Sequence, residues 1–241
     1  MQRYFVESKE NNYLILNKED LHHIKNVMRN KVGDHIETVF NEKLYISEIE
    51  SLNDRKVKII EEKKDNNELN TDISIAIALV KEQKMDIILQ KLTELGVNKI
   101  IPLKMERSII KIDEKKELKK IERWKSICKE ASEQSKRNKI PTISSITTLK
   151  DLTKEEYDIK LICSTNEKSN IISKYLKEKL TNKKIIFVIG PEGGITDKEE
   201  KILIDSGFTP ISLGKRIMRV ETAAIYIASI INYYSLEWWR W

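Results

Sequence analysis

Histidine and cysteine are scarce in this chain of 241 residues, and their scarcity narrows the chemistry that it can perform. The three histidines, His22, His23 and His35, all fall in the first forty residues, so the rest of the chain offers no histidine base and no Ser-His-Asp triad. The two cysteines, Cys128 and Cys163, have neither CxxC spacing nor a histidine nearby, which argues against a zinc site. We therefore expect no metal.

Long apolar runs are also missing. No stretch approaches the roughly 20 apolar residues that a bilayer crossing requires, and the opening sequence MQRYFVESKE carries neither an export signal nor an organelle leader. We expect a soluble, cytoplasmic protein with no membrane partner. Its length suits two domains, each with a buried core.

The basic charge is unevenly distributed. Residues 1–72 hold 12 basic and 15 acidic residues, which gives this part a net charge of −3. Because the whole chain has a net charge of +6, residues 73–241 carry a net charge of +9. A basic face that attracts phosphates is one interpretation. A general enrichment in lysine, with most lysines solvating helices, is the other, and charge alone leaves both open.

The first third of the chain is typical of a small β-barrel. Its short runs alternate apolar with polar residues, as half-buried strands do, at 3–6, 13–16, 35–40, 44–49 and 57–60. One helix is expected over about 18–29, with Asn17 or Asn12 at its start. The polar, aperiodic segment 61–72 is the best linker candidate, so we place domains at 1–70 and 71–241.

The second domain alternates strands with helices. Apolar strands are expected at 73–80, 99–103, 160–163, 184–189 and 210–213, with helices over 84–95, which Gly96 ends, and about 113–135. Apolar strands joined by helical crossovers predict an α/β domain with a parallel sheet covered on both faces.

Glycine is rare, and its placement is informative. Four of the seven glycines, Gly190, Gly193, Gly194 and Gly214, follow the last two strands, where ligands bind in open α/β sheets. The first loop leads into TDKE (196–199), a capping box that opens a helix. Neither the P-loop lysine nor GxGxxG is present. The second loop carries Lys215, Arg216 and Arg219 to a helix N-terminus, where cations oppose the macrodipole and are oddly placed for stability alone.

Several motifs, in order, resemble one family across nearly the whole chain. They are KMD (84–86) with QKLTELG (90–96), ERS (106–108), EASEQS (130–135) with Arg137, IGPEGG (189–194) and SLGKRIMRVETAA (212–224). In these the chain resembles the RsmE family of 16S ribosomal RNA uridine-N3 methyltransferases, in the SPOUT class.

The resemblance implies a fold and an activity. The α/β domain would have a SPOUT-type parallel sheet with a C-terminal trefoil knot, which general rules of chain connection would argue against. The knot loops would hold S-adenosylmethionine (SAM) as methyl donor, a homodimer would complete the site, and the N-terminal barrel would be PUA-like and bind RNA. The partner would be 16S rRNA or the small ribosomal subunit.

The resemblance also implies site residues, with no metal among them. Arg219 would stabilise negative charge on the uracil carbonyls, and a carboxylate or water would take the N3 proton. Glu221 is the nearest candidate base, with a structural role at the start of the last helix as the alternative. The SAM pocket would comprise Thr165, Gly190, Glu192, Gly193, Gly194, Leu213, Gly214, Ile217 and Met218. RNA contacts would comprise Arg3, Arg29, Arg107, Gln134, Arg137, Lys215 and Arg216. For Arg107, Gln134 and Arg137 the alternatives are a place in the partner subunit's site and a structural salt bridge.

Other functions stay open at this point. They are another SPOUT activity such as ribose 2′-O methylation, a non-catalytic ribosome assembly factor, and a small-molecule methyltransferase, for which an RNA-binding domain would be of little use. The tail EWWRW (237–241) could stack on bases, but we expect its rings to pack on the domain or at a dimer interface.

Overall fold

The computed structural model describes residues 1–176 and 180–235 and divides the chain into two compact units. One unit is Met1–Glu68 with Lys129–Lys139, and the other is Leu69–Cys128 with the chain from Ile140 onward. The contact-based boundary lies two residues before the predicted one. The segment Lys129–Lys139, which the predicted domains place in the second half, belongs by its contacts to the first unit. The tail 237–241 lies outside the described residues.

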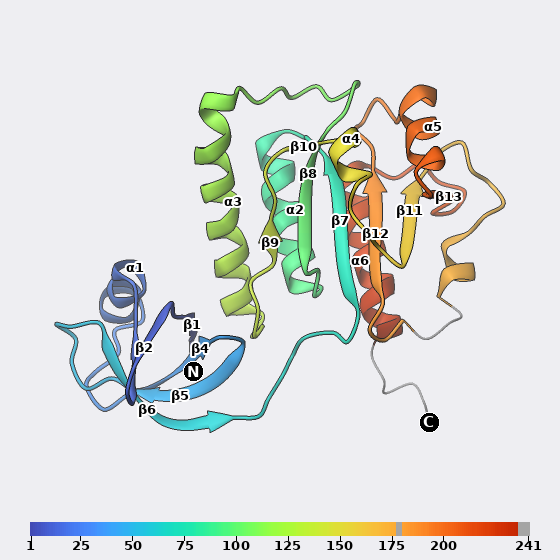
Figure 1. Ribbon diagram of the computed structural model, residues 1–241. Helices are drawn as coiled ribbons and strands as arrows, with labels where there is room; N and C mark the ends of the chain where they lie inside the picture. The colour runs from blue at the N-terminus through green and yellow to red at the C-terminus, as the bar shows by residue number, and fades with distance from the viewer. Residues whose placement is uncertain (177–179, 236–241) are drawn as a thin grey trace. The chain divides into compact units, whose positions relative to one another are not determined.

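The first unit is built on a six-stranded sheet (Figure 1). The strand order is β1-β4-β5-β6-β3-β2, with β1 and β4 parallel and the other neighbours antiparallel. Its elements are β1 (Arg3–Phe5), β2 (Ser8–Glu10), β3 (Tyr13–Ile15), α1 (Lys18–His22), the π-helix η1 (His23–Val27), β4 (His35–Phe40), β5 (Lys43–Glu48) and β6 (Lys56–Lys63). The alternating runs bury one face, including Tyr4, Leu14, Ile36 and Val57.

Two details of this unit were not predicted. The helix expected over about 18–29 does begin at Asn17, whose side chain accepts a hydrogen bond from the Asp20 amide at 2.6 Å, but it changes to a π-helix at His23. Strand β2 has no apolar residue, and all three of its residues are exposed, so periodicity gave no signal for it.

The second unit contains a seven-stranded sheet whose strands all pair in parallel. Its main path is β10-β8-β7-β12-β11-β13, and β9 also pairs with β8. The strands are β7 (Asp72–Ala78), β8 (Lys99–Lys104), β9 (Thr142–Ile143), β10 (Thr147–Thr148), β11 (Ile159–Cys163), β12 (Lys184–Ile189) and β13 (Thr209–Ile211). The predicted parallel α/β sheet is therefore confirmed.

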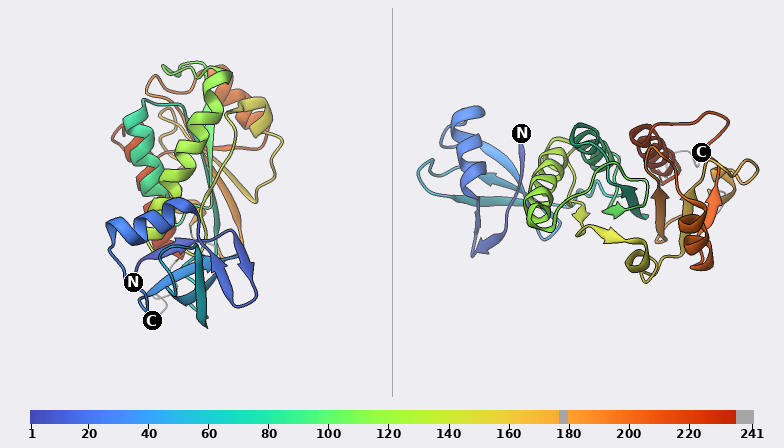
Figure 2. Two further views of the ribbon diagram at one scale, coloured as in Figure 1. Left: turned by 90° about the vertical axis from the view of Figure 1, so that its left-hand side faces the viewer. Right: turned by 90° about the horizontal axis from the view of Figure 1, so that it is seen from above.

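Helices cover both faces of this sheet, as the view from above in Figure 2 shows. They are α2 (Glu82–Glu94), α3 (Glu114–Gln134), α4 (Leu149–Leu152), the 3-10 helix η2 (Ile172–Tyr175), α5 (Asp197–Asp205) and α6 (Val220–Ser235). Along β7, Ile73, Ile75 and Ile77 face α2 and α6, whereas Ala76 and Ala78 face α4 and α5. Gly96, with φ +86°, ends α2 as predicted.

Buried ion pairs join Lys129–Lys139 to the rest of the first unit. The Nε of Arg137 lies 3.2 Å from both carboxylate oxygens of Glu68, and Arg3 donates from Nε to Glu37 at 2.9 Å. Arg3 also donates to the carbonyl of Arg137 at 3.0 Å. Arg3 and Arg137 are each 3% exposed, so both guanidinium groups serve the interior of the unit.

Replacing Arg137 with alanine should destabilise this unit, because the Glu68 carboxylate, whose side chain is only 11% exposed, would lose its guanidinium partner. We expect a loss of about 3–5 kcal/mol in the free energy of unfolding, measured by urea denaturation. Lys139→Ala is the matched control, since Lys139 pairs with exposed Glu42 at 3.2 Å, and should cost about 1 kcal/mol or less. Equal losses in the two variants would contradict a structural role for Arg137.

Candidate functional site

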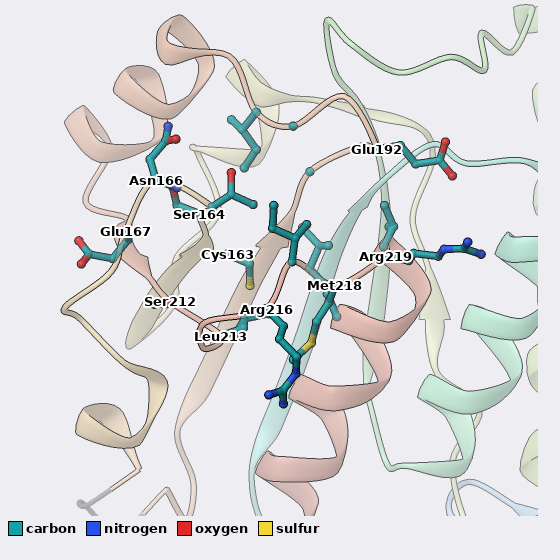
Figure 3. A pocket seen from close by; sticks show the side chains of 18 of the residues that line it. Cys163, Ser164, Asn166, Glu167, Glu192, Ser212, Leu213, Arg216, Met218 and Arg219 are labelled. Carbon is teal, nitrogen blue, oxygen red and sulfur yellow. The ribbon is translucent and has the colours of Figure 1, made fainter.

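A pocket of about 440 Å³ lies at the carboxyl ends of three neighbouring strands, β12, β11 and β13 (Figure 3). It is lined by residues 163–168 after β11, 189–195 after β12 and 212–220 after β13, together with Glu200 and Ala223. The sheet topology thus brings together loops that are separated along the sequence. All nine residues predicted for the SAM site line this pocket: Thr165, Gly190, Glu192, Gly193, Gly194, Leu213, Gly214, Ile217 and Met218.

The loop 190–195 needs its glycines for steric reasons. Gly194 donates from its amide to the Pro191 carbonyl at 2.9 Å and has φ +75°, a turn that L side chains rarely adopt. A Cβ on Gly190 would lie 2.4 Å from Cγ1 of Ile195. The loop therefore packs on itself and leaves its backbone open to the pocket.

The ERS motif holds this loop from outside. Arg107 donates from Nη1 to the Gly193 carbonyl at 3.0 Å, and the Glu106 amide donates to the Glu199 carboxylate at 2.7 Å. Glu199 is buried, and with Thr196 it forms the predicted capping box that opens α5. Arg107 thus contacts the loop through a backbone carbonyl and not through the salt bridge considered above, and because it is exposed its predicted RNA contact stays a prediction.

The loop after β13 presents cations beside an apolar wall. Gly214 has φ +118°, and a Cβ added there would meet no atom within 4 Å, so the space next to it is open. Lys215, Arg216 and Arg219 are exposed and line the pocket, as does Ile217 with 85% of its surface exposed. Leu213 and Met218 of the same loop, with Val220 and Ala223 of α6, provide apolar surface to the pocket.

The loop after β11 forms a polar wall that the sequence analysis mostly missed, since it selected only Thr165. The Glu167 carboxylate accepts hydrogen bonds from the amides of Ser169 and Asn170 at 2.6 and 2.8 Å. These backbone donors lower the pKa of Glu167 to about 2. Acidic and small polar residues just after a strand were the available signal, and this loop places ionised Glu167 and polar Ser164 and Asn166 at the pocket.

A charged cluster beside the pocket includes Lys84, which was not predicted as a site residue from the sequence. Lys84, in the first turn of α2, forms an ion pair with Glu192, and its Nζ lies 3.6 Å from Oε2 of Glu221. The hydrogen bond to Glu192 raises the pKa of Lys84, and the same contact lowers the pKa of Glu192. Lys84 stands in the KMD motif, but its partners lie 108 and 137 residues further along the chain.

The two predicted catalytic residues differ in their access to the pocket. Arg219 lines it and is exposed, whereas Glu221 is not among the lining residues. Oε2 of Glu221 is buried and accepts no hydrogen bond within the described part of the chain. Glu221 therefore stands behind the pocket wall, against Lys84.

The remaining predicted RNA residues belong to the first unit. Arg29 and Gln134 are exposed there, whereas Arg3 and Arg137 are buried in the ion pairs described above. A buried, paired guanidinium cannot reach a phosphate unless the unit opens. Burial thus disfavours RNA contact by Arg3 and Arg137, and neither is carried forward as an RNA ligand.

The described residues contain neither a metal-binding cluster nor a membrane-spanning helix. Over residues 1–176 and 180–235, no group of three or more His, Cys, Asp or Glu side chains is arranged to hold a metal ion. In the same ranges, none of the helices has the length and apolar character needed to cross a membrane.

Comparison with known proteins places this architecture in a family. The RNA methyltransferase domain matches residues 67–232, and the RNA methyltransferase PUA domain matches residues 16–62. Ribosomal RNA small subunit methyltransferase E of Bacillus subtilis is 36% identical over 97% of this chain and 96% of its own length. The protein of the same name from Mesomycoplasma hyopneumoniae is 38% identical over 94% of this chain and 97% of its own.

Solved structures agree with the sequence comparison. A ribosomal RNA small subunit methyltransferase E from Neisseria gonorrhoeae, crystallised with S-adenosyl methionine, is 28% identical, covers 97% of each chain and has a TM-score of 0.86. A structure from Legionella pneumophila, solved with bound SAM, is 31% identical over 96% of each chain with a TM-score of 0.87. By its domain matches, identity and coverage, this chain belongs to the ribosomal RNA small subunit methyltransferase E family.

Proposed function

We propose that this chain transfers the methyl group of SAM to N3 of a uridine in 16S ribosomal RNA. The observation that carries the proposal is the pocket, because it gathers all nine residues predicted for SAM in a chain of this family. Its volume of about 440 Å³ falls in the usual range of about 300–1,000 Å³ for small-molecule sites. Relatives crystallised with SAM support the choice of methyl donor.

The residues present suit SAM. The glycine loop 190–194 and the open space at Gly214 expose backbone groups for hydrogen bonding, and Leu213 and Met218 offer apolar surface to an adenosine ring. Ser164 and Asn166 offer polar groups to the charged amino-acid end. SAM when bound supplies an activated methyl group on a sulfonium.

Binding of SAM should be lost in Gly214→Arg, because the new side chain would enter the pocket. The matched control is Gly207→Arg, since Gly207 also has a positive φ (+86°) and open space around a Cβ but does not line the pocket. Calorimetric titration should give at least about a tenfold weaker Kd for Gly214→Arg and the native Kd for Gly207→Arg. Equal weakening in both variants would indicate backbone strain rather than pocket filling.

The chemical step requires the N3 proton to leave, because only then is the N3 lone pair free to attack. Arg219, exposed at the pocket, would stabilise the negative charge that develops on the uracil carbonyls. Glu221 was the proton acceptor suggested by sequence, and its place behind the wall makes that role indirect. Holding both reactants in orientation can contribute roughly 7–11 kcal/mol.

RNA engagement would rest on exposed cations. Lys215 and Arg216 line the pocket beside Arg219, and Arg29 is exposed on the first unit, so each could contact phosphates. Gln134, also exposed, could add a neutral polar contact. A substrate in the ribosome would place this protein in the cytoplasm.

Incubation with SAM and 16S rRNA, followed by digestion to nucleosides and mass spectrometry, tests the activity. We expect 3-methyluridine from the native protein, and in Arg219→Ala a kcat lower by about 10²- to 10³-fold, the usual effect of removing one such donor, with little change in SAM affinity. A 2′-O-methylated product would mean ribose chemistry instead. RNA binding with neither SAM affinity nor product would mean an assembly factor.

We also propose the homodimer and the trefoil knot of the SPOUT class. The support for the dimer is an exposed stripe on α6, where Thr222, Tyr226 and Tyr233 lie on one side while Ala223, Ile227 and Ile231 are buried on the other. Aromatic residues on an exposed helix face are typical of interfaces. The threading of the chain through 190–219 rests on the family alone.

Sedimentation velocity should give the mass of two chains for the native protein and of one chain for Tyr226→Glu, because a carboxylate would be buried unpaired at the interface. Ile202→Glu is the control, since Ile202 and Tyr226 are both 38% exposed but Ile202 lies on α5. A native protein that sediments as a monomer, or dimers in both variants, would contradict an interface at Tyr226.

A further inference from the structure

Lys84 occupies a position that helix stability does not explain. It stands in the first turn of α2, where a cation opposes the macrodipole and no side chain caps the helix. Its ammonium group pairs with Glu192 of the loop after β12 and lies 3.6 Å from Glu221 in the first turn of α6. Lys84 thus links three elements around one end of the pocket.

The two carboxylates around Lys84 are not equivalent. Glu192 lines the pocket and its side chain is 40% exposed, whereas the Glu221 side chain is 19% exposed and stands outside the lining. Both Glu192 and Arg219 border the pocket near the start of α6 (Figure 3). Of the two carboxylates, only Glu192 can meet a base that enters the pocket.

We propose that Lys84 is a positioning residue that holds the Glu192 carboxylate at the pocket as the acceptor of the uridine N3 proton. The inference rests on the proposed function. As the N3–H bond breaks, its electron pair stays on uracil and the proton passes to Glu192. The N3 lone pair then forms the bond to the methyl carbon, and the electrons of the broken carbon–sulfur bond return to sulfur. Glu192 releases its proton to water afterwards.

Glu221 completes this arrangement. When Glu192 takes the proton it loses its charge and attracts Lys84 less strongly. Oε2 of Glu221 is buried, accepts no hydrogen bond within the described residues and lies 3.6 Å from the ammonium group. The Glu221 carboxylate can therefore pair with the Lys84 ammonium group in place of Glu192, so that no unpaired cation is left at the pocket wall.

The charges around Glu192 set the direction of a pH effect. Lys84 lowers the pKa of Glu192 most, with smaller contributions from Lys81 and Arg219, and Glu221 competes for Lys84. An acceptor must be ionised, so activity should fall as the pH drops through the pKa of Glu192. Without the Lys84 charge that pKa rises, and the fall in activity moves to higher pH.

The test measures kcat against pH with saturating SAM and RNA, together with SAM affinity by calorimetry. Glu192→Gln should lower kcat at saturating SAM by about 10²-fold or more, because the amide keeps the size of the side chain but cannot accept the proton. Lys84→Met should move the acid limb of the profile to higher pH, and Lys84→Arg should restore it. Lys91→Met, which breaks an ion pair with Glu94 on the same helix away from the pocket, should leave the profile in place.

Two results would overturn the inference while leaving the methyltransferase proposal standing. One is a native kcat in Glu192→Gln. The other is a Lys84→Met variant that loses activity or thermal stability with the acid limb unmoved, as a merely structural ion pair predicts. Absence of 3-methyluridine with the native protein would instead overturn the proposed function, and with it this inference.

Discussion

The parallel pairing of β12 with β7 on one side and β11 on the other is the constraint on which the site depends. Because these strands run in the same direction, their carboxyl ends meet at one edge of the sheet, and so do the loops that follow them. Strand β13 extends this edge beyond β11. Burial of both faces fixes the register, since Ile185 and Phe187 serve one core and Ile186 and Val188 the other.

Charged side chains form ion pairs in the interior of the first unit as well as on its surface. Lys129 pairs with Asp20 of α1, and Arg137 pairs with Glu68, so ion pairs hold the segment Lys129–Lys139 to the rest of this unit. Burial raises the pKa of Glu133 to about 7, although the neighbouring Lys129 ammonium group opposes this shift. Basic residues that the sequence suggests as phosphate ligands can thus be buried in ion pairs inside the unit.

Sequence patterns predicted those features that depend on neighbouring residues in the chain. The β12 strand was predicted at its observed bounds, and the capping box of Thr196 and Glu199 and the end of α2 at Gly96 were also found from sequence. The two-residue strands β9 and β10 were missed because their existence depends on β8, some forty residues away. The role of Lys84 was missed for the same reason, since neither of its carboxylate partners is near it in the sequence. The sequence does not show which side chains are buried. It therefore could not distinguish Arg137, which is buried, from Arg29, which is exposed and accessible to RNA.

The scarcity of histidine shapes what the pocket can do. In the proposed site the proton acceptor is a carboxylate, which is a weak base in water and weaker still beside cations. The proposed site offsets this by placing Arg219 where it can stabilise the uracil anion, so that the acidity of N3 rises while Lys84 keeps Glu192 ionised. Lowering the pKa of both the donor and the acceptor in this way requires cations at fixed positions on both sides of the proton. In the proposal, the ion pair between Lys84 of α2 and Glu192 of the loop after β12 supplies one of these fixed positions.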